Sequence, residues 1–108
     1  MNDISDIDRE LAKKSVEICL DDRIIPAWEY QILSGYTREE AMQLLRNWPE
    51  QFECDHAASI IVLNSINNLA GYPHGAKSEV EARLGASISQ LDRAWFNINA
   101  AVTQRRAK

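Results

Sequence analysis

Apolar residues recur at steps of three and four along most of the chain, which is the spacing of amphipathic helices. The pattern carries no alternation of the kind that a half-buried strand requires. It predicts a first helix that begins after the cap residue Ser5 and ends near Leu20, followed by a turn at Asp21-Asp22. Further helices are expected over 26–35, 37–48, 55–70 and 78–103.

Local signals define several of these boundaries. Pro26 suits the first turn of the second helix, and Gly35 is a favourable residue just past its end. The stretch from Thr37 to Glu40 reads as a capping box, in which each of these two side chains accepts from the backbone N–H of the other residue. Pro49 is expected to end the third helix.

The segment 55–70 is apolar on most sides, which is typical of a helix in the middle of a bundle. Its amides Asn64, Asn67 and Asn68 are expected to be buried and hydrogen-bonded. Whether 78–103 is one helix or two, with a break near Gly85, stays open at this point. With no repeat or linker recognised, residues 1–108 are expected to form an all-α, single-domain bundle of five or six helices with short loops, the helix 55–70 being central.

Composition is that of a globular protein, with 45% hydrophobic and 26% charged residues. No stretch has the ~20 apolar residues that a membrane helix needs, so no membrane partner is expected. The N-terminus lacks the basic start and apolar core of an export signal. Cys19 and Cys54 are too few for a disulfide scaffold, although a single bridge stays open. These features favour a cytoplasmic protein.

Charge is distributed unevenly between the halves of the chain. Residues 1–56 contain 13 acidic and 6 basic residues, whereas residues 57–108 contain 3 acidic and 6 basic residues. Helix capping explains part of the acidic excess. We expect the remainder to form one negative rim that attracts a basic protein partner, provided that the loops converge. The rim residues are Asp21, Asp22, Glu50, Glu53 and Asp55.

Aromatic residues are concentrated in the same half. Tyr30 and Tyr36 beside acidic residues have the composition of a protein-binding surface, although half-buried packing is the competing interpretation. Tyr72 and His74, in a loop between Gly71 and Gly75, complete the expected set of anchors.

Catalysis and metal binding receive little support. Cys54, His56 and the distant His74 are ligand types without a recognised spacing. No nucleophile elbow, phosphate-binding loop or paired-histidine motif occurs. We therefore expect no catalytic residue, no metal, no cofactor and no enzymatic activity.

A DNA-binding regulator is the alternative. Residues 78–97 resemble a helix-turn-helix, with the turn around Gly85 and with Gln90, Arg93 and Asn97 as candidate base-reading residues. Glu81 and Asp92 depart from that pattern, and the acidic pI of about 5.1 makes nucleic acid an unlikely partner.

Three stretches together resemble small helical bacterial immunity proteins of polymorphic toxin systems. They are IPAWEY at 25–30 with Gly35, TREE through WP at 37–49, and LAGYPHG at 69–75, and the resemblance covers roughly residues 24–75. It implies a cytoplasmic inhibitor that binds a toxin domain, often a basic nuclease, through an acidic surface. The oligomeric state is not predicted.

Overall fold

The computed structural model describes residues 4–71 and 77–106, and these residues form helices without any strand. The all-α prediction is therefore confirmed. The described residues contain one helix more than the five or six expected: α1 Asp6–Cys19, α2 Ala27–Ser34, α3 Arg38–Arg46, α4 Glu50–Cys54, α5 His56–Gly71, α6 Lys77–Leu84 and α7 Ile88–Arg106.

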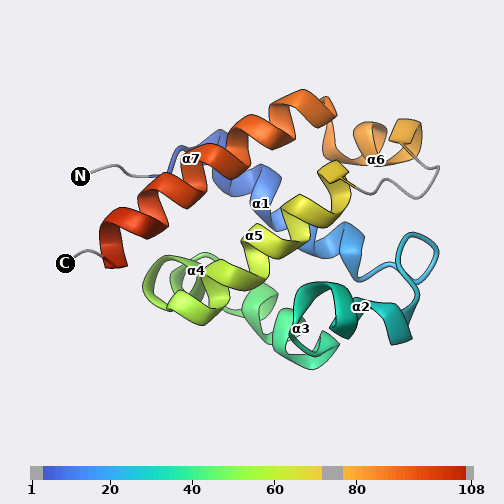
Figure 1. Cartoon of the computed structure of the whole chain (residues 1–108), viewed down its shortest axis with the longest axis horizontal. Coiled ribbons are helices and arrows are strands. Elements are labelled where there is room, and N and C mark those ends of the chain that lie inside the picture. The colour runs from blue at the N-terminus through green and yellow to red at the C-terminus, as the bar shows by residue number, and fades with distance from the viewer. Residues whose placement is uncertain (1–3, 72–76, 107–108) are drawn as a thin grey trace.

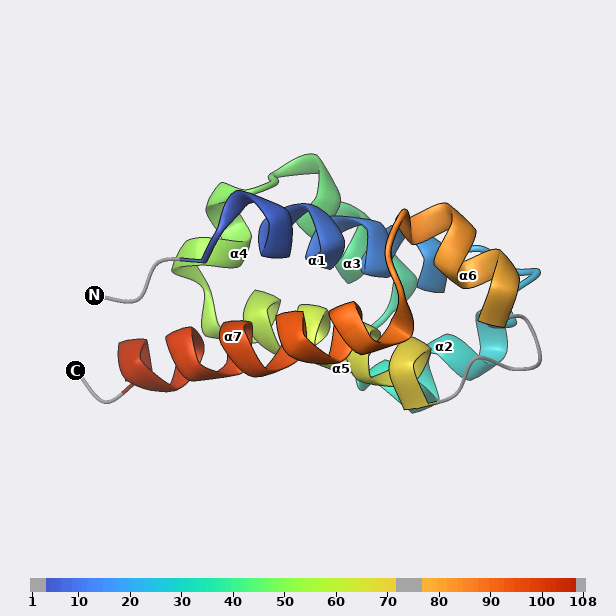
Figure 2. The same cartoon turned by 90° about the horizontal axis from the view of Figure 1, so that it is seen from above.

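The helix α5 lies in the middle of the bundle, as its apolar sequence predicts. It packs most extensively on α1 and α7, and it also contacts α2, α3 and α4. Figure 1 shows α5 between α1 and α7 on one side and α2, α3 and α4 on the other, and Figure 2 shows α1 and α7 as two separate rows seen from above. Side chains that are buried along α5, such as Val62 and Ile66, join those of every neighbouring helix in one core.

The short helix α4 was not predicted. Pro49 removes a backbone donor and ends α3, but the chain turns back into one further helical stretch from Glu50. Phe52 is fully buried in this stretch and stacks on Trp48, with ring centroids 4.8 Å apart. Burial of that one ring explains why five residues without a good helix cap adopt a helix.

The final segment is two helices, and the break falls at Gly85. This residue has φ of 69°, a left-handed conformation that favours glycine. Gly35, between α2 and α3, has the matching φ of 81°. Both glycines donate their N–H four residues back, to the carbonyls of Gln31 and Glu81 respectively.

This match is part of a structural repeat with an offset of 50 residues. The starts of α1 and α5 are residues 6 and 56, those of α2 and α6 are 27 and 77, and those of α3 and α7 are 38 and 88. Each second helix ends on the residue before the equivalent glycine. The expectation that the chain contains no repeat is therefore wrong at the level of structure.

Hydrogen bonds repeat in the same register. Thr37 and Glu40 form the predicted capping box of α3, and Ser87 and Gln90 make the equivalent pair of bonds at the start of α7. The hydroxyls of Ser15 and Ser65 donate to carbonyls four residues back, at 2.7 and 2.8 Å.

The two repeats exchange their first helices. The helix α1 packs on α6, the second helix of the other repeat, and α5 packs on α2 in the same way, while both first helices also contact α3 and α7. Lys14 of α1 donates to the carbonyl of Leu84 at the end of α6, and its equivalent Asn64 of α5 donates to the carbonyl of Ser34 at the end of α2. Such reciprocity is what an approximate twofold axis between α1 and α5 produces. It also creates equivalent surfaces at two places on one chain.

Candidate functional site

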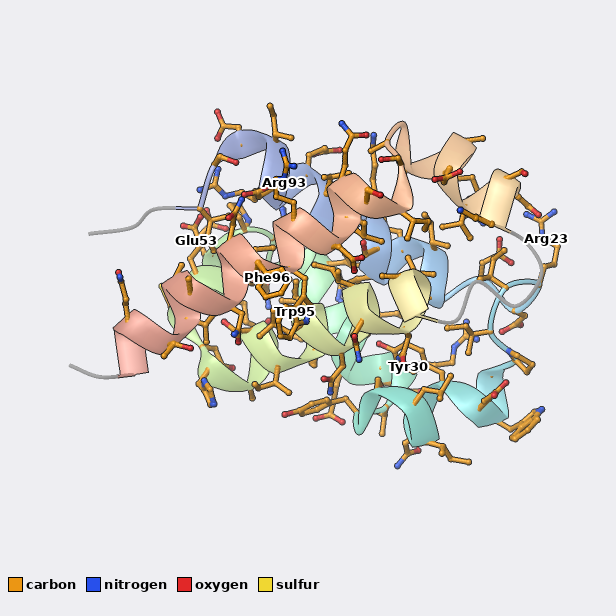
Figure 3. The ribbon with its side chains drawn as sticks, turned by 45° about the horizontal axis from the view of Figure 1, so that its top comes forward. Arg23, Tyr30, Glu53, Arg93, Trp95 and Phe96 are labelled. Carbon is orange, nitrogen blue, oxygen red and sulfur yellow. The ribbon has the colours of Figure 1, made fainter. Side chains whose placement is uncertain are left out.

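The five acidic residues of the expected rim do not come together. Asp21 and Asp22 lie in the loop after α1, whereas Glu50 and Glu53 lie in α4. Figure 3 places Arg23, which is bonded to Asp21, and Glu53 at opposite ends of the molecule's long axis. The expectation of a single negative rim is therefore wrong, because the turn of α1 and the helix α4 face different ends of the bundle.

The acids of the 21–22 turn are also occupied by arginines. Asp21 accepts from Arg23 at 3.0 Å and from Arg83 of α6 at 2.7 Å, while Asp22 pairs with Arg38 of α3. The side chain and backbone N–H of Arg23, with further help from Arg83, hold the pKa of Asp21 well below its usual range. These carboxylates tie the loop to α3 and α6.

The acids at the other end differ from one another. Glu53 pairs with Arg9 of α1 at 2.6 Å, which joins α4 to α1. Glu50 is exposed. Asp55 is also exposed, and one of its oxygens accepts from the backbone N–H of Ala57 at 3.0 Å in the first turn of α5. Among the five, Glu50 and Asp55 are exposed and form no ion pair in the described part of the chain.

The predicted aromatic anchors also differ from one another in burial. Tyr30 is 1% exposed, and within the described residues its hydroxyl has no hydrogen-bond partner. Burial raises its pKa. The expectation that Tyr30 contacts a partner is wrong, because its ring belongs to the core. Tyr36 is half-buried, and Tyr72 and His74 lie outside the described residues.

A groove between the start of α3 and the start of α5 is lined by Asp55 and by two acids of α3, whereas Glu50 lies outside it. We call it the acidic groove, with a volume of roughly 330 Å³. Three of its described lining side chains are carboxylates and none is a cation. The lining residues are Tyr36, Glu39, Glu40, Gln43, Gln51, Asp55, Ala57, Ala58 and Ile61.

Local structure positions the charged side chains of this groove. The left-handed Gly35 turns the chain so that Tyr36 and the first turn of α3 line one wall. The carboxylate of Glu40 accepts from the backbone N–H of Thr37 at 2.9 Å, which holds it in place. Glu39 is exposed. Carboxylates beside a tyrosine ring form a favourable site for a guanidinium or ammonium group.

The repeat places a second groove at the equivalent position. We call it the α1–α7 groove, and its volume is roughly 350 Å³. Ile7 and Leu11 stand where the acidic groove has Ala57 and Ile61, at the offset of 50 residues. The lining residues are Ile7, Asp8, Glu10, Leu11, Lys14, Leu84, Gly85, Ala86, Gln90 and Arg93.

An exposed apolar pair lies on α2, one turn apart. Trp28 is 72% exposed and Ile32 is 73% exposed. The equivalent positions of α6 are Ser78 and Ala82, which shows that the repeated fold does not need large apolar side chains there. Exposed apolar surface of this kind is typical of a protein-binding face.

The residues of the helix-turn-helix alternative are also placed. Helices α6 and α7 meet at Gly85, and both pack on α1, which is a three-helix arrangement. Gln90 is held in its capping box, and Asn97 donates to Asp8 at 3.1 Å. Arg93 is exposed on α7. Glu81 accepts from the backbone N–H of Ile88 at 2.8 Å, so this acid stabilises the start of α7.

The predicted amides of α5 are only partly buried. Asn64 is half-buried and bonded to Ser34, whereas Asn67 is exposed and Asn68 is half-buried. Asn64 thus has the expected hydrogen bond, but the expectation of a row of buried amides is wrong, because none of the three is fully buried.

Reactive groups are few in the described part of the chain. Residues 4–71 and 77–106 contain no group of three or more His, Cys, Asp or Glu side chains that could hold a metal ion. Cys19 and Cys54 are both free, and burial raises the pKa of Cys19 to about 12. A thiol with that pKa stays protonated and is a poor nucleophile.

Comparison of the chain with protein-family models, with curated proteins and with solved structures gives no match. Within the described residues, no helix has the combined length and apolar character needed to cross a membrane.

Proposed function

We propose that this chain is a protein-binding module that takes a basic segment of its partner into the acidic groove. The observation that carries the proposal is the groove wall itself, where Glu39, Glu40 and Asp55 line the same groove as Tyr36 and none of the described lining residues is a cation. Opposite charge across an interface speeds association and selects partners.

The most concrete form of this proposal is an immunity protein that neutralises a basic toxin domain in the cytoplasm. A cationic side chain of the toxin would enter between the carboxylates and the ring of Tyr36. The exposed pair Trp28 and Ile32 on the neighbouring helix α2 supports a protein partner, because large apolar side chains at protein interfaces contribute much of the binding energy.

The test uses the purified product of the neighbouring gene as the candidate toxin. Affinity is measured by calorimetry for the unaltered chain and for the double variant Glu39→Ser and Asp55→Asn. We expect the variant to lose at least tenfold in affinity, about 1.4 kcal/mol, and to show a weaker salt dependence.

Glu50→Gln is the control, compared with the double variant per neutralised charge. Glu50 is exposed on α4 and does not line the groove, so its neutralisation removes one acidic charge without changing the site. Equal losses per neutralised charge for the control and the groove variant would reduce the effect to overall charge and contradict the proposal. The fold contacts of Glu53 and Asp21 make those residues unsuitable as controls.

The second candidate is a DNA-binding regulator that uses residues 78–97. The three-helix packing of α1, α6 and α7 and the exposed Arg93 favour it. The engagement of Gln90 and Asn97 within the fold, together with the exposed Asp92, disfavours it. Sequence-specific retardation of the chain's own upstream DNA, lost in Arg93→Ala, would support this candidate over the first.

A further inference from the structure

We propose that the α1–α7 groove is a second binding site, and that it takes a peptide segment in which an aliphatic side chain lies beside a carboxylate. The site is separate from the acidic groove and differs from it in chemistry.

Comparison of the two grooves shows which lining residues the repeated fold does not require. Equivalent positions have the same backbone setting and nearly the same burial, yet the acidic groove's Ala57 is Ile7 in the α1–α7 groove. The Gln43 of the acidic groove is replaced by Arg93 at the equivalent position. The repeated fold forms with alanine or isoleucine at the first of these positions and with glutamine or arginine at the second. The fold therefore does not require Ile7 or Arg93, and both side chains are available to contact a ligand.

The apolar part of the site lies on α1. Ile7 is 74% exposed at the edge of the groove, and Leu11 follows one helical turn later. Ala86 replaces the Tyr36 of the acidic groove and leaves room between the walls. An exposed isoleucine beside such a space favours an aliphatic side chain as its partner, because both lose apolar surface to water on contact.

The charged part of the site has cations without carboxylate partners. Arg93 forms no ion pair or hydrogen bond within the described residues, and Lys14 donates to the backbone carbonyl of Leu84 at 3.3 Å. Asp8 is bonded to Asn97 at 3.1 Å. A carboxylate of the ligand can therefore pair with Arg93 in a two-pronged geometry. Glu10, the remaining acid of the lining, disfavours a second carboxylate on the ligand.

The dimensions fit a short piece of peptide. A volume of roughly 350 Å³ is near the lower limit for ligand pockets, enough for one side chain and its neighbouring backbone. The groove lies between α1 and the turn at Gly85 and is partly open to solvent, so a bound segment need not be enclosed in it. A peptide segment therefore suits the site better than a compact ligand that must be enclosed.

The test is a titration followed by amide chemical shifts of the full chain. N-acetyl-leucine carries an aliphatic side chain beside a carboxylate, and N-acetyl-leucinamide is the same molecule without the charge. We expect saturable shifts at 7–14 and 84–93 with the acid, and binding at least tenfold weaker with the amide. Absence of saturable shifts, or equal binding of the two compounds, would overturn the proposal.

Two variants take their residues from the equivalent positions of the other repeat. Arg93→Gln and Ile7→Ala should each weaken N-acetyl-leucine about tenfold while leaving thermal unfolding unchanged. Unchanged binding in Arg93→Gln would also overturn the proposal. Free leucine is the last compound to titrate, since its ammonium could pair with Glu10. Tighter binding of free leucine than of N-acetyl-leucine would indicate that the groove takes an amino acid in place of a peptide segment. That result would overturn the proposal.

Discussion

The acidic groove and the α1–α7 groove occupy equivalent places in the two repeats, but their wall chemistry differs at nearly every position. The residues that build the repeat are kept in kind: glycines with positive φ, capping pairs, and serines bonded one turn back. The residues that line the grooves are not kept, as Tyr36 against Ala86 and Glu40 against Gln90 show. Positions that the fold leaves free thus carry the differences in wall chemistry.

The repeats also differ in how their third helices end. Pro49 breaks the first repeat into α3 and α4, whereas the equivalent Asn99 lets α7 continue to Arg106. Phe52 and its equivalent Val102 are nevertheless both buried. The helix α4 is therefore the detached continuation of α3, and it fills the same part of the core.

The largest expected effect on stability tests whether Phe52 of α4 and Val102 of α7 fill equivalent parts of the core. Phe52→Ala should lower the free energy of unfolding by about 3–5 kcal/mol, because a fully buried ring is lost and a cavity remains. Val102→Ala should cost about 1–2 kcal/mol, since only two methyl groups are removed. Urea denaturation measures both. A cost below ~1 kcal/mol for Phe52→Ala would mean that α4 does not belong to the core.

Glycine substitutions test whether the two turns are equivalent. Gly35→Ala and Gly85→Ala should each lower the free energy of unfolding by about 1 kcal/mol, because φ is 81° and 69° at these positions. Space is not the reason: an added Cβ meets nothing within 4 Å at Gly35 and only the Lys14 ammonium, 3.9 Å away, at Gly85. Guanidinium denaturation that shows a cost at one glycine and a gain at the other would contradict the equivalence.

The smallest effect concerns a contact that only one repeat has. Asp21 links the α1–α2 loop to α6 through Arg83, and the equivalent residue 71 is glycine. Because its folded pKa lies below the ordinary value of about 3.9, its stabilising effect is present above that pH and is lost as pH falls through the folded pKa. Asp21→Asn should therefore unfold at a lower temperature than the unaltered chain at neutral pH.

The same measurement in strong acid provides the control. The two unfolding temperatures should converge as pH falls below the folded pKa of Asp21, because the unaltered carboxyl is then protonated. A gap that stays constant from neutral to strongly acidic pH would show that charge at Asp21 is not the cause.

Much of the fold could be predicted from sequence because its signals are local. The capping box at Thr37 and Glu40 and the continuous apolar run of α5 both lead directly to observed helices. The helix α4 could not be predicted, because its formation depends on the tertiary burial of Phe52.

The repeat was hidden for a similar reason. Buried positions need only be apolar, so Leu11 matches Ile61 and Tyr30 matches Val80 without identity. Four pairs are identical between 6–48 and 56–98, too few to stand out: Ser15 and Ser65, Glu29 and Glu79, Gly35 and Gly85, Asn47 and Asn97. The paired glycine and capping signals at 35–40 and 85–90 were the one local indication.

The candidate site could not be predicted without the three-dimensional structure. Acid content alone could not show that Asp21, Asp22 and Glu53 pair with arginines, because Arg83 and Arg9 are 62 and 44 residues away from Asp21 and Glu53. Nor could it show that Asp55, at the start of α5, meets Glu39, at the start of α3. Packing of α5 on α3 brings these two residues to the same groove.

The central claim is that the acidic groove binds cationic peptide and the α1–α7 groove does not. The most direct measurement is an amide-shift titration of the full chain with an amidated arginine dipeptide. We predict saturable shifts around Tyr36, Glu39 and Asp55, weakened by salt, and strongly reduced in the double variant Glu39→Ser and Glu40→Gln, which carries the residues of positions 89 and 90. Shifts that map instead to Arg93 and Ile7, or that persist unchanged in the double variant, would contradict it.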